Sequence, residues 1–143
     1  MLSNSPYKKM LDEHGFCIVS PVGSSMLPLI EEGTDTVKIV TPTFPLKKYD
    51  VILYQRPNGK NVLHRIVKVT KHGYVVCGDN QVGLEKYVLD EWVIGVMDGY
   101  FKGEVYHYLD DASYLKYSKS IVRRRPLRKV KHMIKKIFKG TTK

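Results

Sequence analysis

Short β-forming runs separated by turn residues are the feature that most constrains how this chain folds. The runs are rich in Val, Ile, Tyr and Phe and are bounded by Pro, Gly, Asn and Asp, a pattern typical of strands. They cover residues 16–20, 36–40, 51–55, 62–69, 74–77, 92–97 and 101–108. Between the third and fourth runs, Asn58-Gly59 is a pair that tolerates the positive φ of a tight hairpin. The sequence therefore predicts a mainly β domain.

Two helical segments are expected outside these runs. Residues 7–13 predict a short helix that ends at Gly15. Near the other end, Pro126 is a favourable first helical residue, and apolar residues then recur at spacings of three and four with basic residues between them. The apolar positions are Leu127, Val130, Ile134 and Ile137, flanked by Met133 and Phe138. This pattern predicts a basic amphipathic helix that ends near Gly140.

Charge divides the chain into two parts. The formal net charge is +10, yet residues 116–143 hold 12 Lys and Arg and no Asp or Glu. The preceding 115 residues carry 12 basic and 14 acidic residues, a net charge of 12 − 14 = −2. At 143 residues the chain suits one domain with an appendage. We predict a domain over residues 1–110 and a basic tail over 111–143.

The basic tail has three candidate roles. Its apolar stripe would pack on the β domain, lie on an anionic membrane surface, or accompany nucleic-acid binding, and the Phe, Ile and Met side chains favour lipid over a phosphate backbone. No apolar run approaches the roughly 18 residues of a membrane span, and the first 14 residues lack the apolar core of a signal peptide. The expected location is cytoplasmic, with peripheral membrane association left open.

The two cysteines, Cys17 and Cys77, lie in apolar stretches where a free cysteine packs as a small hydrophobic residue. A single disulfide is the alternative. Their number and spacing match neither a disulfide framework nor a zinc site. No metal or organic cofactor is expected.

Three polar motifs occur in the order that a serine hydrolase needs. Ser25 lies in Gly23-Ser24-Ser25-Met26-Leu27-Pro28, between an expected strand and an expected short helix. A serine hydroxyl needs a base that is neutral at working pH, and His64, held on the predicted strand 62–69, is the best candidate. Asp79, in Gly78-Asp79-Asn80, would orient the imidazole.

Each motif also has a purely structural interpretation. Ser25 would cap a helix over residues 26–31, His64 would be a packed histidine, and Gly78-Asp79-Asn80 would be an ordinary turn. Their joint occurrence, in order and at strand-sized intervals, favours the chemical interpretation.

Taken together, the motifs resemble those of the type I signal peptidase superfamily, which includes the self-cleaving LexA-like repressors. The resemblance covers residues 16–105. Ser25-Met26-Leu27-Pro28 is similar to the family's nucleophile box, Tyr49-Asp50-Val51-Ile52 to the following strand, and His64-Arg65-Ile66-Val67 to the base box. Gly78-Asp79-Asn80 is similar to the acid box, and Val93-Ile94-Gly95-Val96 to the closing strand.

The resemblance implies a signal-peptidase-like β fold and the branch with a histidine base, as in the endoplasmic-reticulum and archaeal enzymes. That branch has a second acid after the acid box, and this stretch contains Glu85, so Asp79 is the first and Glu85 the second candidate for the orienting acid. Many relatives have Ser two residues before the nucleophile, where this chain has Gly23. The oxyanion hole would then use backbone N–H groups near Ser25, helped by Ser24.

The sequence thus predicts a serine endopeptidase that cleaves a peptide or leader sequence bound in an extended form beside a strand edge. One alternative is a self-cleaving regulator of the LexA-like kind, although those relatives use Lys as the base and are preceded by a helix-turn-helix that is not found here. The other is a non-catalytic module whose basic tail binds membrane or, less favourably, nucleic acid.

Overall fold

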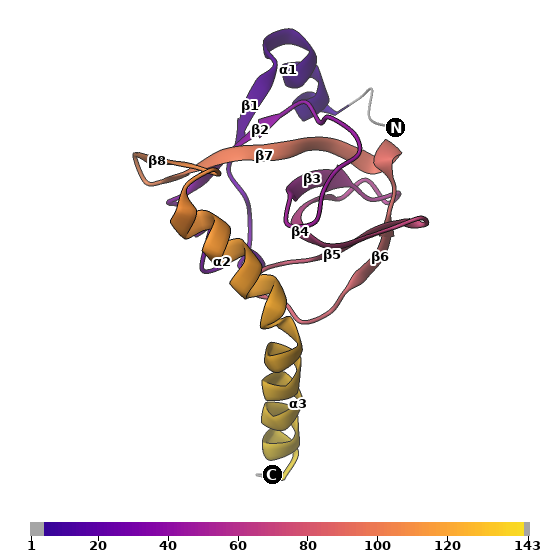
Figure 1. Cartoon of the computed structure of the whole chain (residues 1–143), viewed down its shortest axis with the longest axis vertical. Helices are drawn as coiled ribbons and strands as arrows, with labels where there is room; N and C mark the ends of the chain where they lie inside the picture. Colours follow the sequence, from indigo (N-terminus) through magenta and orange to yellow (C-terminus); the bar gives the residue numbers. More distant parts are fainter. Residues whose placement is uncertain (1–4, 142–143) are drawn as a thin grey trace.

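One antiparallel sheet dominates the computed structural model, which describes residues 5–141 and side chains up to Lys139 (Figure 1). Eight strands form the sheet within this range. They are β1 (Phe16–Val19), β2 (Thr36–Val40), β3 (Val51–Gln55), β4 (Asn61–Thr70), β5 (Gly73–Cys77), β6 (Glu85–Val88), β7 (Val93–Lys102) and β8 (Val105–Tyr108). The helices are α1 (Pro6–His14), α2 (Ala112–Arg123) and α3 (Arg125–Thr141), with a short 3-10 turn, η2 (Asp90–Trp92), before β7. The predicted mainly β fold is confirmed.

The strand order is β1-β2-β7-β3-β4-β5-β6, with β8 paired to β7. Strand β7 therefore lies between two strands that precede it in the chain, and it joins the β1-β2 pair to the β3-β4-β5-β6 meander. In the β3-β4 hairpin, Val51 faces Arg65 and Gln55 faces Asn61 across the predicted Asn-Gly turn. This register fixes which side chains of β3 lie beside His64.

Alternation along the strands places apolar side chains on both faces of the sheet. Leu53 and Leu63 belong to one buried cluster, which also contains residues of α1, the Ser25 loop and α2. Ile52, Tyr54 and Ile66 belong to a second cluster on the opposite face. Because both faces are covered, a polar side chain on the central strands must have partners inside the protein.

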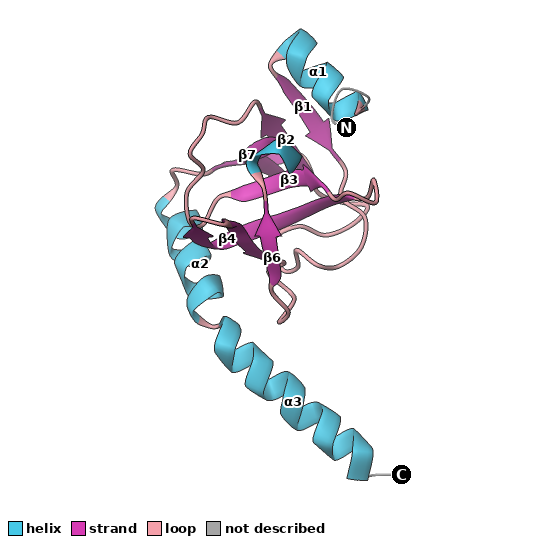
Figure 2. Cartoon of the chain, turned by 90° about the vertical axis from the view of Figure 1, so that its right-hand side faces the viewer, coloured by secondary structure: helices cyan, strands magenta, loops and turns pink. Residues whose placement is uncertain are grey.

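The helices lie at the margins of the sheet (Figures 1 and 2). The first, α1, begins at Ser5, whose hydroxyl accepts a hydrogen bond from the Lys8 N–H, and packs beside β1 and β7. The second, α2, begins at Asp111, whose carboxylate caps the Ser113 N–H, and its Tyr114 and Ser118 side chains are buried. The third, α3, extends away from the sheet (Figure 2).

Several predicted boundaries need correction. The runs 92–97 and 101–108 do not form separate strands, because β7 continues from Val93 to Lys102 and reverses at Gly103 into β8. Asp98-Gly99 looks like a break in the sequence, yet Gly99 stays in the sheet opposite Lys38 and Tyr108, with the Tyr106 ring lying where a side chain would be. The strand β6 and the helix α2 were not predicted.

The predicted C-terminal helix is confirmed as α3. The apolar side chains of α3 are exposed. They therefore do not pack on the β domain, which was one of the three roles considered for the basic tail.

Candidate active site

Ser25 lies in the loop that follows β1, where the chain leaves the sheet for the buried residues Met26, Leu29 and Ile30. The predicted helix over residues 26–31 was wrong, because this segment forms successive turns. The Ile30 N–H donates to the Met26 carbonyl and the Leu27 N–H donates to the Ser24 carbonyl, but no regular helix continues. Pro28 explains the difference, since it disfavours helical backbone at the residue before it.

Ser25 and His64 line the same cavity, which has a volume of about 720 Å³. One wall is formed by residues 19–26 and the other by the ends of β3 and β4, with Asn80 and Gln81 completing the rim. Ser25 is half-buried. Within residues 5–141, the Ser25 hydroxyl group forms no hydrogen bond with His64 or with any other group. The structure therefore brings both members of the predicted dyad to one cavity.

His64 is held on β4, directly opposite Ile52 of β3, and the residue is 7% exposed. Burial lowers the pKa of the imidazole to about 4, and the negative charge of Glu85 only partly opposes this effect. At neutral pH the ring is therefore neutral, which is the state that a general base needs.

A series of connected polar side chains reaches the His64 ring at its Nδ1 atom. The Tyr54 hydroxyl lies 3.4 Å from His64 Nδ1 and donates a hydrogen bond of 2.7 Å to Glu85 Oε1. Arg56 holds the same carboxylate through both Nε and Nη2. Since the single Tyr54 proton goes to Glu85, the Tyr54 oxygen is left to accept from Nδ1–H, and this tautomer leaves Nε2 free to accept a proton.

Burial and the hydrogen bond to Glu85 both raise the pKa of Tyr54, so it stays protonated as the donor in this chain. Burial alone would raise the pKa of Glu85, but hydrogen bonds from Arg56 and Tyr54 bring it below its ordinary value. Glu85 is thus a fixed negative charge two contacts away from the imidazole. Neither Tyr54 nor Arg56 was among the predicted site residues.

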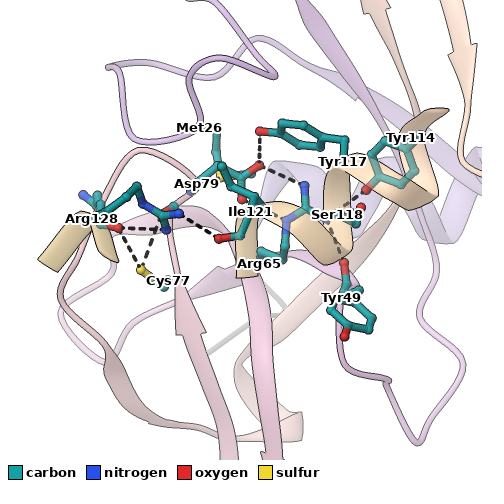
Figure 3. A network of polar contacts seen from close by, with 12 residues as sticks. Met26, Tyr49, Arg65, Cys77, Asp79, Tyr114, Tyr117, Ser118, Ile121 and Arg128 are labelled. Atoms are coloured by element: carbon teal, nitrogen blue, oxygen red, sulfur yellow. Dashed lines mark hydrogen bonds and ion pairs between the residues drawn. The ribbon is translucent and has the colours of Figure 1, made fainter. Parts of the chain in front are cut away.

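Asp79 has different partners. Its two carboxylate oxygens accept hydrogen bonds from Arg65 Nε and Nη2 at 2.8 and 2.9 Å, and both side chains are almost fully buried. The Tyr117 hydroxyl of α2 donates a third hydrogen bond of 2.8 Å to Asp79 (Figure 3). Arg65 also donates to the Tyr49 carbonyl and, on α2, to Tyr114 and Ser118. This network ties α2 to the strand that carries His64.

The acid box also supports the Ser25 loop through its backbone and amide groups. The Asn80 N–H donates to the Ser25 carbonyl at 2.8 Å, and Asn80 Nδ2 donates to the Ser24 carbonyl at 3.1 Å. Gly78 lies so close that a Cβ atom there would meet the Ser25 carbonyl oxygen at 2.6 Å. Gly78-Asp79-Asn80 therefore sets the position of the Ser25 loop relative to β4.

The residues expected to form the oxyanion hole also line the cavity. Ser24 is exposed, and Gly23 has φ +92°, a backbone conformation that a serine would adopt only with strain. Glycine at position 23 suits this loop geometry. Backbone N–H groups near Ser25 remain the candidate donors.

Cys17 and Cys77 are both free and buried, so they pack as the small hydrophobic residues that the sequence suggested. Burial raises the pKa of both thiols. Among the described residues, no group of three His, Cys, Asp or Glu side chains is arranged to hold a metal ion.

Comparisons of the chain with protein-family models, with curated proteins and with solved structures found no match.

Proposed function

We propose that this protein is a serine endopeptidase with a signal-peptidase-like fold, in which Ser25 is the nucleophile and His64 the general base. The observation that carries the proposal is that a half-buried serine and a buried, neutral histidine line one cavity although they are far apart in the chain. The similarity of the motifs to the serine-histidine branch of the signal peptidase superfamily supports the same reaction.

In the proposed reaction, Ser25 Oγ attacks the scissile carbonyl carbon while His64 Nε2 accepts the hydroxyl proton. The imidazolium then delivers that proton to the leaving amine, and water hydrolyses the acyl-enzyme with His64 again acting as the base. The negative charge of Glu85, relayed through the Tyr54 hydroxyl, stabilises the transient imidazolium. This geometry favours Glu85 over Asp79 as the acid that serves His64.

An extended peptide is the substrate that fits the cavity. Strand β4 pairs with β3 from Asn61 to Arg65, but its pairing with β5 begins only at Arg65. The other edge of residues 61–64 therefore has no strand partner within the described chain, and this edge lines the cavity. A substrate strand would add here through main-chain hydrogen bonds, which would bring its scissile bond alongside Ser25.

The test is labelling by a fluorophosphonate, which reacts with activated serine hydroxyls. We expect the wild-type protein to be labelled at Ser25, with Ser25→Ala abolishing and His64→Gln strongly slowing the reaction. Ser20→Ala is the matched control, because Ser20 is an exposed serine that lines the same cavity. Labelling that persists in Ser25→Ala, or a wild-type protein that is never labelled, would contradict the proposal.

A further inference from the structure

The helix α3 presents an exposed apolar stripe. Its apolar residues recur at helical spacings, and their side chains are between 45 and 64% exposed. They are Leu127, Val130, Met133, Ile134 and Ile137. Leaving this much aligned apolar surface in water is unfavourable, and a contiguous stripe of this kind marks an interaction surface.

The opposite face of α3 is basic. Residues 125–141 contain seven Lys and Arg and no Asp or Glu. At 3.6 residues per turn, Lys129, Lys131, Lys135 and Lys136 fall outside the apolar stripe and border it or lie opposite it. An apolar stripe flanked by cations on a single helix matches the boundary between the acyl chains and the head groups of an anionic bilayer.

The first turn of α3 fixes the helix to the domain by its polar face. Arg125 Nη1 donates to the Val82 carbonyl at 2.7 Å, and Arg128 donates to the Ile121 and Gln81 carbonyls. Arg128 also lies beside the Cys77 thiol (Figure 3). Because these two arginines reach the domain, the apolar stripe is left free along a helix that extends outward (Figure 2).

We propose that α3 is a membrane-surface anchor that lies in the plane of an anionic lipid bilayer, with its apolar stripe in the acyl region and its lysines at the phosphates. No helix in the described part of the chain is long and apolar enough to cross a bilayer. A second copy of the chain is a poorer occupant of the stripe, because two helices with seven cations each would repel one another. Nucleic acid would engage the lysines but leave the aliphatic stripe in water.

The anchor also bears on the proposed site. Gln81, whose carbonyl accepts from Arg128, lines the cavity that contains Ser25 and His64. A helix held at this loop would keep the cavity at a fixed position relative to the bilayer surface. The binding surface itself does not depend on the proposed peptidase activity.

Co-sedimentation of the full-length protein with vesicles tests the anchor. We expect binding to vesicles of equimolar phosphatidylcholine and phosphatidylglycerol, little binding to phosphatidylcholine alone, and weakening by added salt. Ile134→Gln with Ile137→Gln should lower the partition coefficient about tenfold or more. Lys131→Gln with Lys135→Gln should lower it similarly, and only on the anionic vesicles.

Matched controls lie on the domain. Val105→Gln changes an aliphatic residue as exposed as those of the stripe, and Lys68→Gln with Lys71→Gln removes two exposed cations, so neither variant should alter binding. The proposal would be overturned if the protein bound neither kind of vesicle. It would also be overturned if the protein bound a DNA duplex in a salt-sensitive way and the isoleucine substitutions left that binding unchanged. Fluorophosphonate labelling of Ser25 in each variant, measured without vesicles, keeps this result separate from the peptidase hypothesis.

Discussion

At the residue scale, the structure distinguishes between the two acids that the sequence offered to His64. Asp79 is fully engaged by Arg65 and Tyr117, whereas Glu85 reaches the imidazole through the Tyr54 hydroxyl. Asp79, which is closer to His64 in the sequence, is therefore engaged in structural contacts, and the more distant Glu85 is the acid connected to His64.

Replacing Tyr54 with Phe should reduce turnover without unfolding the protein. The substitution keeps the buried ring but removes the acceptor that orients His64 Nδ1–H, so kcat for peptide cleavage should fall about tenfold to a hundredfold with KM little changed. Tyr74→Phe is the matched control, because the Tyr74 hydroxyl also donates to a carboxylate, that of Asp90, on the same face of the sheet. Equal losses of kcat in both variants would point to a general packing effect and exclude a positioning role for Tyr54.

The buried His64 should also make stability depend on pH. The pKa of His64 is about 4 in the folded protein, below the roughly 6.5 of an unfolded histidine. Between these two pH values, His64 is protonated in the unfolded state but stays neutral in the folded state. The contribution of His64 to the free energy of unfolding is therefore complete above about pH 6.5, and it falls by about 3 kcal/mol as the pH drops to 4. Urea unfolding of the wild type and of His64→Gln at pH 7 and pH 4.5 measures this difference.

Other ionisable groups also titrate between these pH values, in the wild type and in His64→Gln alike. The contribution of His64 is therefore the amount by which the free energy of unfolding changes more with pH in the wild type than in His64→Gln. His72→Gln, at an exposed histidine, should behave like the wild type. The same low pKa predicts that kcat/KM for cleavage stays high well below pH 6.5 and declines toward pH 4. A decline centred near pH 6.5 would show that the imidazole is much more accessible to solvent than in this structure.

Ser25 and His64 stand out in the sequence as a candidate nucleophile and a candidate base, because this chemistry is restricted to a few residue types in a fixed order. Tyr54 carries no such signature, since tyrosine is common in strands. Its position beside His64 follows only from the register of β3 and β4. The Asn58-Gly59 turn sets Gln55 opposite Asn61. This register places Tyr54 opposite Val62 and diagonal to His64, on the same face of the sheet. Register could have been inferred from that turn, but the Glu85 contact depends on β6, which the sequence pattern did not reveal.

At the scale of elements, the turn Gly78-Asp79-Asn80 acts as a brace that connects the Ser25 loop to the sheet. The Asn80 amide groups hold the carbonyls of Ser24 and Ser25, and the Asp79-Arg65 pair fixes the same turn to β4. In the proposed mechanism, these contacts would hold Ser25 at a fixed position relative to His64.

Gly78→Ala should impair the site more than the fold. The added methyl group would lie 2.6 Å from the Ser25 carbonyl oxygen, so the Ser25 loop must shift relative to β4, which carries His64. A displacement on the order of 1 Å can reduce the rate about a hundredfold. Gly83→Ala is the control, because a Cβ there meets nothing within 4 Å and its φ is not in the left-handed region. The rate of fluorophosphonate labelling, alongside a urea titration, reports both effects.

If Gly78→Ala were labelled as fast as the wild type, the brace would tolerate the extra methyl group and the close approach would have no functional meaning. The local sequence alone could not predict this brace. Gly-Asp-Asn is an ordinary turn signal, and the partner that makes its glycine necessary is a loop that lies more than fifty positions earlier in the chain.

At the scale of the whole molecule, the folded unit does not end where the basic segment of the sequence begins. The excess of Lys and Arg begins at residue 116, inside α2, yet α2 contributes Tyr114 and Ser118 to the buried interior. Charge counting detects where basic residues become frequent, but it does not detect that a helix is held by hydrogen bonds to a buried arginine on a distant strand. The apolar stripe of α3 was predictable because a single helix shows its periodicity without any partner, whereas its exposure was not, since packing on the β domain was one of the alternatives.

Two truncations should separate the contributions of α2 and α3 to stability. Ending the chain after Asp111 removes Tyr114 from the core and deprives buried Arg65 of two acceptors, Tyr114 and Ser118. Loss of a large buried aromatic side chain costs about 3–5 kcal/mol and an unpaired buried donor about 1–3 kcal/mol, so this chain should be mostly unfolded or strongly destabilised. Ending it after Arg124 removes α3 alone and should cost about 1–2 kcal/mol, for the lost Arg125 and Arg128 contacts.

Urea unfolding followed by the fluorescence of Trp92 compares both truncated chains with the full protein. Ser118→Ala serves as the point control for the first truncation, since it removes one acceptor of Arg65 and leaves α2 in place. If the chain that ends at Asp111 were as stable as the one that ends at Arg124, α2 would be an appendage like α3. A large difference between them would show that the folded unit extends to the end of α2 and that only α3 is free to lie on a membrane.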